Sequence, residues 1–143
     1  MKKRTEELLE ILNKSPNIQD YYDNESENII TMTLPEYLKE LCKVKGISKA
    51  ECIRKSQLPR TYGYQIFSGL KKPTRNKVLC LCFGFCLTVE ESQSLLKAAG
   101  YPILYARNKR DAVILFALLR SLSVMEVNDM LYELKYALLT SEH

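Results

Sequence analysis

Residues 46–74 read GISKAECIRKSQLPRTYGYQIFSGLKKPT. Two short helices fit this stretch, at 49–56 and 60–68, with a break between them at Leu58-Pro59. Proline there cannot continue the first helix, but it can stand at the start of the second. Two such short helices cannot each bury both of their faces. They are expected to pack across each other, which leaves the second helix presented outward.

Helix starts are marked along the chain by Ser or Thr followed three residues later by Glu. In such a capping box the hydroxyl accepts from the backbone amide of the third helical residue, and the carboxylate accepts from the amide of the capping residue. The pattern occurs four times, at Thr33 and Glu36, Ser48 and Glu51, Thr88 and Glu91, and Ser123 and Glu126. Gly46, Gly69 and Gly100 stand where the preceding helices are expected to end.

No segment shows the sustained period-two alternation of a half-buried strand, so the sequence predicts an all-α protein without a sheet. Helices are expected at about 4–13, 34–45, 49–56, 60–68, 75–86, 89–99, 109–121 and 124–138, with a short one around 18–22. Three regions are predicted, namely an N-terminal helix with an acidic linker (1–32), a central domain (33–100) and a C-terminal helical extension packed on it (101–143).

Positive charge is concentrated in one part of the chain. The 143 residues carry a net charge of +4, but residues 34–77 contain eleven Lys and Arg against three Asp and Glu, a net charge of +8. Residues 1–33 carry −3 and residues 78–143 carry −1. A local basic surface attracts polyanions more strongly than the net charge of the whole chain suggests.

Cysteine usage and hydropathy bear on the cellular compartment. An odd number of cysteines, five, and a basic start without an apolar core after it argue against a secreted disulfide framework. The longest apolar run, 78–87, is about half the length that a membrane span needs. We therefore expect a cytoplasmic protein without membrane association. The cysteines are Cys42, Cys52, Cys80, Cys82 and Cys86.

The residues needed for catalysis or metal binding are sparse. The single histidine is His143, there is no CxxC pair, and there is no glycine-rich phosphate loop. Cys82 and Cys86 share a helix face, but Cys80 points elsewhere, and buried core cysteine is the usual role of this residue type. Cys52 falls on the predicted buried side of its helix. The sequence thus predicts no metal, no cofactor and no enzymatic activity.

The central stretch resembles the helix-turn-helix of Cro and phage repressors, the XRE-like family of transcriptional regulators. The resemblance rests on 46–51, 58–61, 66–69 and 71–74, whose spacing fits the family without a gap, and it covers about 34–86. It implies a repressor-like five-helix core with the N-terminal helix and two C-terminal helices added to it. It also implies a DNA-binding transcriptional regulator that binds double-stranded DNA as a homodimer.

The resemblance also implies roles for individual residues, and the helical spacing within 60–68 adds Tyr64 to them. Arginine can bond bidentately to guanine, and glutamine to adenine, in the major groove of DNA. Basic residues outside the recognition helix would hold phosphates and fix the register. The predicted base-reading residues are Arg60, Thr61, Tyr64 and Gln65, and the predicted phosphate contacts are Lys49, Lys71, Lys72 and Arg75.

An alternative function uses the same fold without DNA. Tyr64 and Phe67 are aromatic on a face that is usually polar, and exposed aromatics also mark protein-binding surfaces. In that interpretation the protein is a non-catalytic adaptor anchored to a partner through these two rings. Gly63 stands where the family usually buries an aliphatic residue, so it is expected to leave a hole unless Tyr62 fills it.

The N-terminal residues 1–13 are expected to form an amphipathic helix. It either folds back on the core or exchanges between subunits, because the polar connection after it permits both. The dimer contact is expected through this arm or through the helices at 109–121 and 124–138. The acidic stretch 20–27 could also cover the basic face by charge attraction.

Overall fold

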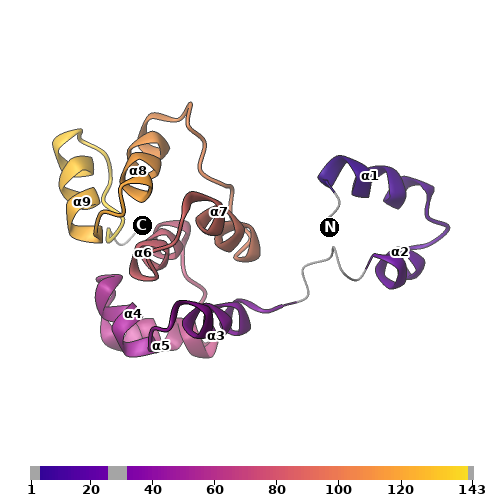
Figure 1. Cartoon of the computed structure of the whole chain (residues 1–143), viewed down its shortest axis with the longest axis horizontal. Helices are drawn as coiled ribbons and strands as arrows, with labels where there is room; N and C mark the ends of the chain where they lie inside the picture. The colour runs from indigo at the N-terminus through magenta and orange to yellow at the C-terminus, as the bar shows by residue number, and fades with distance from the viewer. Residues whose placement is uncertain (1–3, 26–31, 142–143) are drawn as a thin grey trace. The chain divides into compact units, whose positions relative to one another are not determined.

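The computed structural model describes residues 4–25 and 32–141, and within them it contains nine α-helices and no strand (Figure 1). The predicted all-α class is confirmed for this part of the chain. None of the described helices combines the length and the apolar character that a membrane crossing needs. The chain divides into two compact units, one up to Thr31 and one from Met32 onward, with no further division between the central and C-terminal regions.

The N-terminal unit contains α1 (Thr5–Lys14) and α2 (Ile18–Asn24), which contact each other. Asn17 caps α2 by accepting from the backbone amide of Asp20. Neither helix buries a residue, and Leu9 keeps 60% of its surface exposed. Within this unit, therefore, the apolar residues of α1 are at most half-buried.

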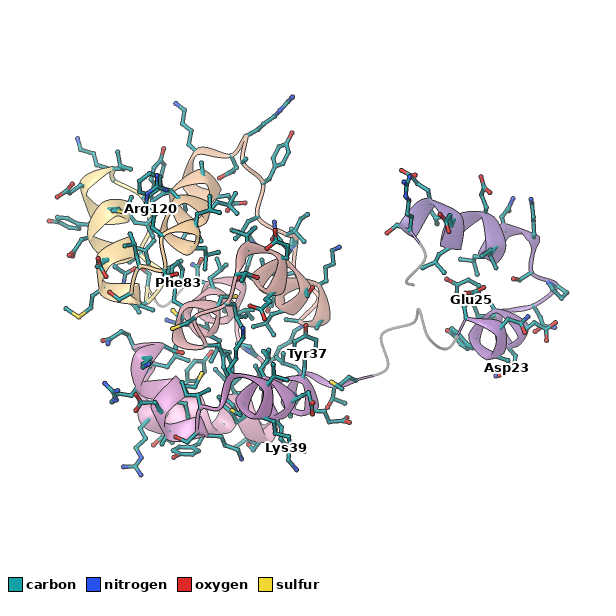
Figure 2. All side chains as sticks on the ribbon, viewed as in Figure 1. Asp23, Glu25, Tyr37, Lys39, Phe83 and Arg120 are labelled. Carbon is teal, nitrogen blue, oxygen red and sulfur yellow. The ribbon has the colours of Figure 1, made fainter. Side chains whose placement is uncertain are left out.

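The second unit is built around a helix that is buried almost throughout. All seven residues from Val78 to Gly84 of α6 are buried, and α6 contacts α4, α7 and α9 (Figure 1). Figure 2 shows Phe83 among the side chains between α6 and the C-terminal helices, where it lines a small cavity together with Leu118 of α8. The helices are α3 (Leu34–Lys45), α4 (Lys49–Lys55), α5 (Arg60–Ser68), α6 (Arg75–Gly84), α7 (Val89–Ala98), α8 (Lys109–Leu119) and α9 (Val124–Glu133).

Three of the four expected capping boxes are complete, at Thr33, Thr88 and Ser123. At the fourth, Ser48 accepts from the backbone amide of Glu51, but the carboxylate of Glu51 turns to Arg54 instead of the Ser48 amide. An arginine three residues along the helix competes successfully with the backbone for that carboxylate. The start of α4 is unaffected, since the hydroxyl bond alone still caps the helix.

Four helices end in a way that the glycine pattern did not predict. A residue other than glycine adopts the left-handed conformation after α4, α6, α8 and α9. The following residue is apolar at every one of these ends, and its amide donates back to a carbonyl in the last turn of the helix. This is the Schellman arrangement, which satisfies carbonyls that the helix leaves free. The four residues are Gln57, Cys86, Ser121 and Lys135, with φ angles of 59°, 56°, 53° and 65°.

The end of α9 differs from the prediction. The helix was expected to reach residue 138, but it stops at Glu133. After the left-handed Lys135 the chain turns back, and Leu139 becomes fully buried. The side chain of Asn128 holds this return, because it accepts from the Leu139 amide at 2.9 Å and donates to the Thr140 hydroxyl at 3.1 Å. Apolar spacing alone could not reveal that turn.

Candidate nucleic-acid interface

The two short helices α4 and α5 meet through a tight turn. Gln57 is left-handed, Leu58 is buried with 7% of its surface exposed, and Pro59 is the N-cap of α5. Pro59 has no side chain that caps the helix, but its carbonyl accepts from the Gly63 amide at 2.8 Å. The fixed φ of proline, −55°, already suits a helix start. The turn therefore starts α5 and sets its direction without a capping side chain.

Gly63 lies directly against α4, and the expectation of a hole there is wrong. A Cβ atom built on Gly63 would lie within 3.0 Å of three side-chain atoms of Ile53, which is 2% exposed. Gly84 of α6 is similarly restricted against the end of α4, since its Cβ would collide with the hydroxyl of Ser56, the C-cap of α4. Glycines on α5 and α6 thus let both helices press directly against α4.

The outward side of α5 brings the predicted base-reading residues together. Arg60, Thr61, Tyr64 and Gln65 line one shallow, open hollow of about 460 Å³, and Lys49 of α4 lines it too. Gly63, Ile66 and Phe67 are the buried residues of the same helix. Helical periodicity explains this division, because Arg60 and Tyr64 are four positions apart on one stripe, and Thr61 and Gln65 are four apart on the stripe beside it. Five predicted contact residues therefore share one solvent-exposed surface.

Arg60 and Tyr64 interact with each other within this surface. The guanidinium carbon of Arg60 lies 5.9 Å from the centre of the Tyr64 ring, a cation–π distance. No carboxylate pairs with Arg60 among the described residues. The ring thus limits the motion of the guanidinium without neutralising its charge, and the N–H groups remain available to another acceptor.

Phe67 does not belong to the exposed surface. Only 5% of it is exposed, and its ring centroid lies 6.3 Å from that of Phe85, the residue that ends α6. The expectation that Phe67 is an exposed aromatic anchor is therefore wrong. Ile66, at 1% exposed, and Tyr62, which packs on the core, hold α5 in place.

The turn after α5 carries two of the predicted phosphate contacts. Gly69 ends α5 in the left-handed conformation, with φ of 87°, and the Lys71 amide donates to the Gln65 carbonyl at 3.1 Å. The side chains of Lys71 and Lys72 are exposed. Lys72 Nζ lies 5.4 Å from the centre of the Tyr101 ring. Neither lysine forms an ion pair within the described part of the chain.

Arg75 differs from these lysines because its guanidinium is already engaged. It donates to both carboxylate oxygens of Asp111, at 3.2 and 3.1 Å, and to the carbonyls of Pro102 and Ile103. The Asp111 side chain is 9% exposed and that of Arg75 is 23% exposed. A guanidinium held by four acceptors in this way is not free to contact phosphate. The contacts of Arg75 therefore favour a structural role over the predicted phosphate contact.

A second hollow also borders Arg60 and Tyr64, and no sequence pattern predicted it. Its volume is about 660 Å³, and its lining is partly apolar. Arg54 stands at this hollow in an ion pair with Glu51, and this pair lowers the pKa of the Glu51 carboxyl. The lining residues are Ala50, Ile53, Arg54, Gln57, Leu58, Pro59, Arg60 and Tyr64.

Nucleophilic chemistry has little support from the buried thiols. Burial raises the pKa values of Cys52, Cys80 and Cys82 to about 12, so all three are neutral thiols near pH 7. Within 4–25 and 32–141, no group of His, Cys, Asp and Glu side chains is arranged to hold a metal ion. The single histidine of the sequence, His143, lies outside the described residues.

Comparison with known proteins finds no matching family model, no matching curated protein and no matching solved structure. The fold and the surface on α5 are therefore interpreted from their own chemistry.

Proposed function

We propose that this protein is a sequence-specific DNA-binding transcriptional regulator. In this proposal α3 to α7 form the repressor-like five-helix core, α4 and α5 form the helix-turn-helix, and α5 enters the major groove. The observation that carries the proposal is the shared open surface of Lys49, Arg60, Thr61, Tyr64 and Gln65. A helix that packs by glycine and apolar residues on one side and exposes this set on the other is suited to a groove.

The chemistry of the four α5 residues fits direct reading of base edges. Arg60 can donate two parallel bonds to guanine O6 and N7, and Gln65 can pair with adenine N6 and N7. Thr61 can bond to either kind of edge, and the ring of Tyr64 can pack on a thymine methyl group or a sugar. Each good bidentate pair discriminates against the wrong base by about 1–3 kcal/mol.

Phosphate contacts would come from two separate elements. Lys49 belongs to α4, whereas Lys71 and Lys72 follow α5 in the chain, so the recognition helix would be held from both of its neighbours. Such contacts fix register and orientation but carry no sequence information. They also draw on the net charge of +8 that residues 34–77 carry.

The proposal includes the wider setting that the resemblance implies. The protein would act in the cytoplasm, without catalysis or a cofactor, and would bind a two-fold DNA site as a homodimer. The second hollow, with its partly apolar lining beside Tyr64, favours a second candidate function, a protein-interaction adaptor. Because Phe67 is buried, Tyr64 alone of the two aromatic residues would serve that adaptor as an anchor.

Fluorescence anisotropy with duplex DNA across a salt series tests the proposal. The double variant Lys71→Ala, Lys72→Ala should flatten the slope of log affinity against log salt by about 0.9 for each lost phosphate contact. The matched control is Lys97→Ala, Lys109→Ala, which removes the same charge from exposed positions on α7 and α8. The control should keep the wild-type slope. Absence of binding at low salt would reject the DNA function and direct attention to the adaptor.

A further inference from the structure

The turn that carries Lys71 and Lys72 is in contact with Tyr101, which lies about 30 residues further along the chain. The Tyr101 hydroxyl donates to the Pro73 carbonyl at 2.5 Å, and the same ring lies 5.4 Å from Lys72 Nζ. One side chain therefore fixes both the backbone of this turn and the direction of one of its cations. The sequence predicted no role for Tyr101 beside those of α5 and of the lysines that follow it.

The segment that supplies Tyr101 is itself firmly anchored. The side-chain amide group of Gln93 on α7 makes two bonds to the Leu104 backbone. Its nitrogen donates to the Leu104 carbonyl at 2.8 Å, and its oxygen accepts from the Leu104 N–H at 2.7 Å. Leu104 is 3% exposed, and the Tyr105 amide donates to Asp111 at 3.0 Å. A connection bonded in this way on both sides has little freedom to move.

A second tie joins the same two parts of the chain one residue after the turn. Arg75, at the start of α6, donates to the carbonyls of Pro102 and Ile103 and to the carboxylate of Asp111. The Asp111 carboxylate therefore binds both Arg75 and the 101–105 connection, since it also accepts from the Tyr105 backbone amide. The turn is thus bounded by α5 on one side and by these ties on the other.

We infer that Tyr101 and Asp111 are positioning residues for DNA binding, which set the affinity without touching DNA. The inference rests on the proposed function. Lysines on a free loop lose conformational freedom when phosphate fixes them, and this loss weakens binding. A turn already held by Tyr101 and by the Arg75–Asp111 pair loses less, so more of the phosphate attraction appears as affinity.

The cleanest test is Tyr101→Phe, because it removes the hydroxyl and leaves the ring beneath Lys72. The matched control is Tyr105→Phe on the same connection, where the residue is 58% exposed and its hydroxyl makes no hydrogen bond to any residue that the structure describes. Two readouts apply to each full-length variant. One is amide hydrogen exchange of Leu70, Lys71 and Lys72 without DNA, and the other is affinity for duplex DNA across a salt series.

Tyr101→Phe should speed exchange at these amides and weaken DNA binding, each by about three- to tenfold, the effect of one lost hydrogen bond. Tyr105→Phe should change neither readout. A second variant, Asp111→Asn, keeps the shape of the side chain but removes the charge that holds Arg75, and it should act in the same direction. Its thermal unfolding, measured alongside, separates a loosened turn from a lost fold.

The two readouts separate this inference from the proposed function. Wild-type protein that binds DNA together with a Tyr101→Phe variant that binds equally well would overturn the positioning role alone, whatever the exchange shows. Wild-type protein that binds no DNA at low salt would overturn the proposed function and the positioning role with it. Faster exchange and weaker binding in Tyr101→Phe, with both unchanged in Tyr105→Phe, support the role.

Discussion

The pairs α4–α5 and α8–α9 use the same backbone corner for different surfaces. Each corner has a left-handed residue, then a leucine, then the N-cap of the next helix, namely 57–59 in one pair and 121–123 in the other. On α5 Arg60 is exposed and Gln65 is half-buried, whereas α9 carries three acidic residues and no basic one. The same turn thus joins both helix pairs, and the outward side chains of the second helix distinguish their surfaces.

The two corners also differ in how closely their helices pack. Gly63 is the fourth residue of α5, and Val127, fully buried, is the fourth residue of α9. Glycine allows α5 to press its backbone against Ile53, whereas α9 has a buried valine side chain at the corresponding position. The position of α5 is therefore determined by the contact of its backbone at Gly63 with the Ile53 side chain of α4.

Placing the α9 residue in α5 should give the largest effect. We expect Gly63→Val to lower the free energy of unfolding by about 3 kcal/mol, because the added atoms overlap Ile53. Urea denaturation measures the change. The double variant Gly63→Val, Ile53→Ala makes room for the new side chain and should recover part of the loss. A fully stable single variant would show that α5 can move away from α4.

An exchange between the outward faces should act on DNA binding next. Gln65 and Asp129 are both the sixth residues of their helices; Asp129 is exposed and Gln65 is half-buried. Gln65→Asp removes the proposed adenine contact and adds a negative charge, so we expect affinity for a specific site to fall about 10- to 100-fold. Asp129→Gln should leave affinity unchanged. Equal effects of the two changes in an anisotropy titration would contradict the assignment of α5 as the recognition helix.

The caps of the two outward helices provide a smaller contrast. Ser123 makes a complete capping box with Glu126, whereas Pro59 offers α5 no capping side chain. Ser123→Ala should destabilise the protein by about 1 kcal/mol in urea denaturation. Ser123→Asp keeps an oxygen that can accept the same bond, and it should retain most of the stability. A loss as large as that of the alanine variant would mean that the hydroxyl acts through another contact.

The shared backbone of the corners predicts equal effects at their left-handed residues. Gln57→Gly and Ser121→Gly each relieve a positive φ that side chains disfavour, and each also increases the freedom of the unfolded chain. We expect each to raise the free energy of unfolding by about 0.5 kcal/mol. Thermal unfolding of the two single variants would check this. Opposite signs would show that the corners are under different strain.

Local chemistry in the sequence was sufficient for most helix boundaries. The predicted bounds of α3 and α5 agree with the structure, because a capping box, a terminal glycine or a proline marks each end. The ends of α4, α6, α8 and α9 were less accurate, since left-handed residues other than glycine have no comparable mark. The early end of α9 depends on Asn128 and Leu139, which meet only after the chain has turned.

The candidate site was predictable where helical spacing alone places a residue. Arg60, Thr61, Tyr64 and Gln65 share a face for that reason, and the structure brings them to one hollow. Phe67 was not predictable in this way, because its neighbour Phe85 comes from the end of another helix. The roles of residues that bind partners far away in the sequence, Arg75 above all, depend on tertiary contacts that periodicity does not contain.

The buried cysteines of α6 can report how often the surrounding helices separate. Cys80 and Cys82 are fully buried, and the Cys80 thiol lies 3.6 Å from the Leu139 carbonyl. An alkylating reagent can reach these sulfurs only when the surrounding helices separate, whereas Cys86 is exposed and should react at once. The delay between the two reactions therefore measures how often the whole assembly of helices comes apart, without any added label.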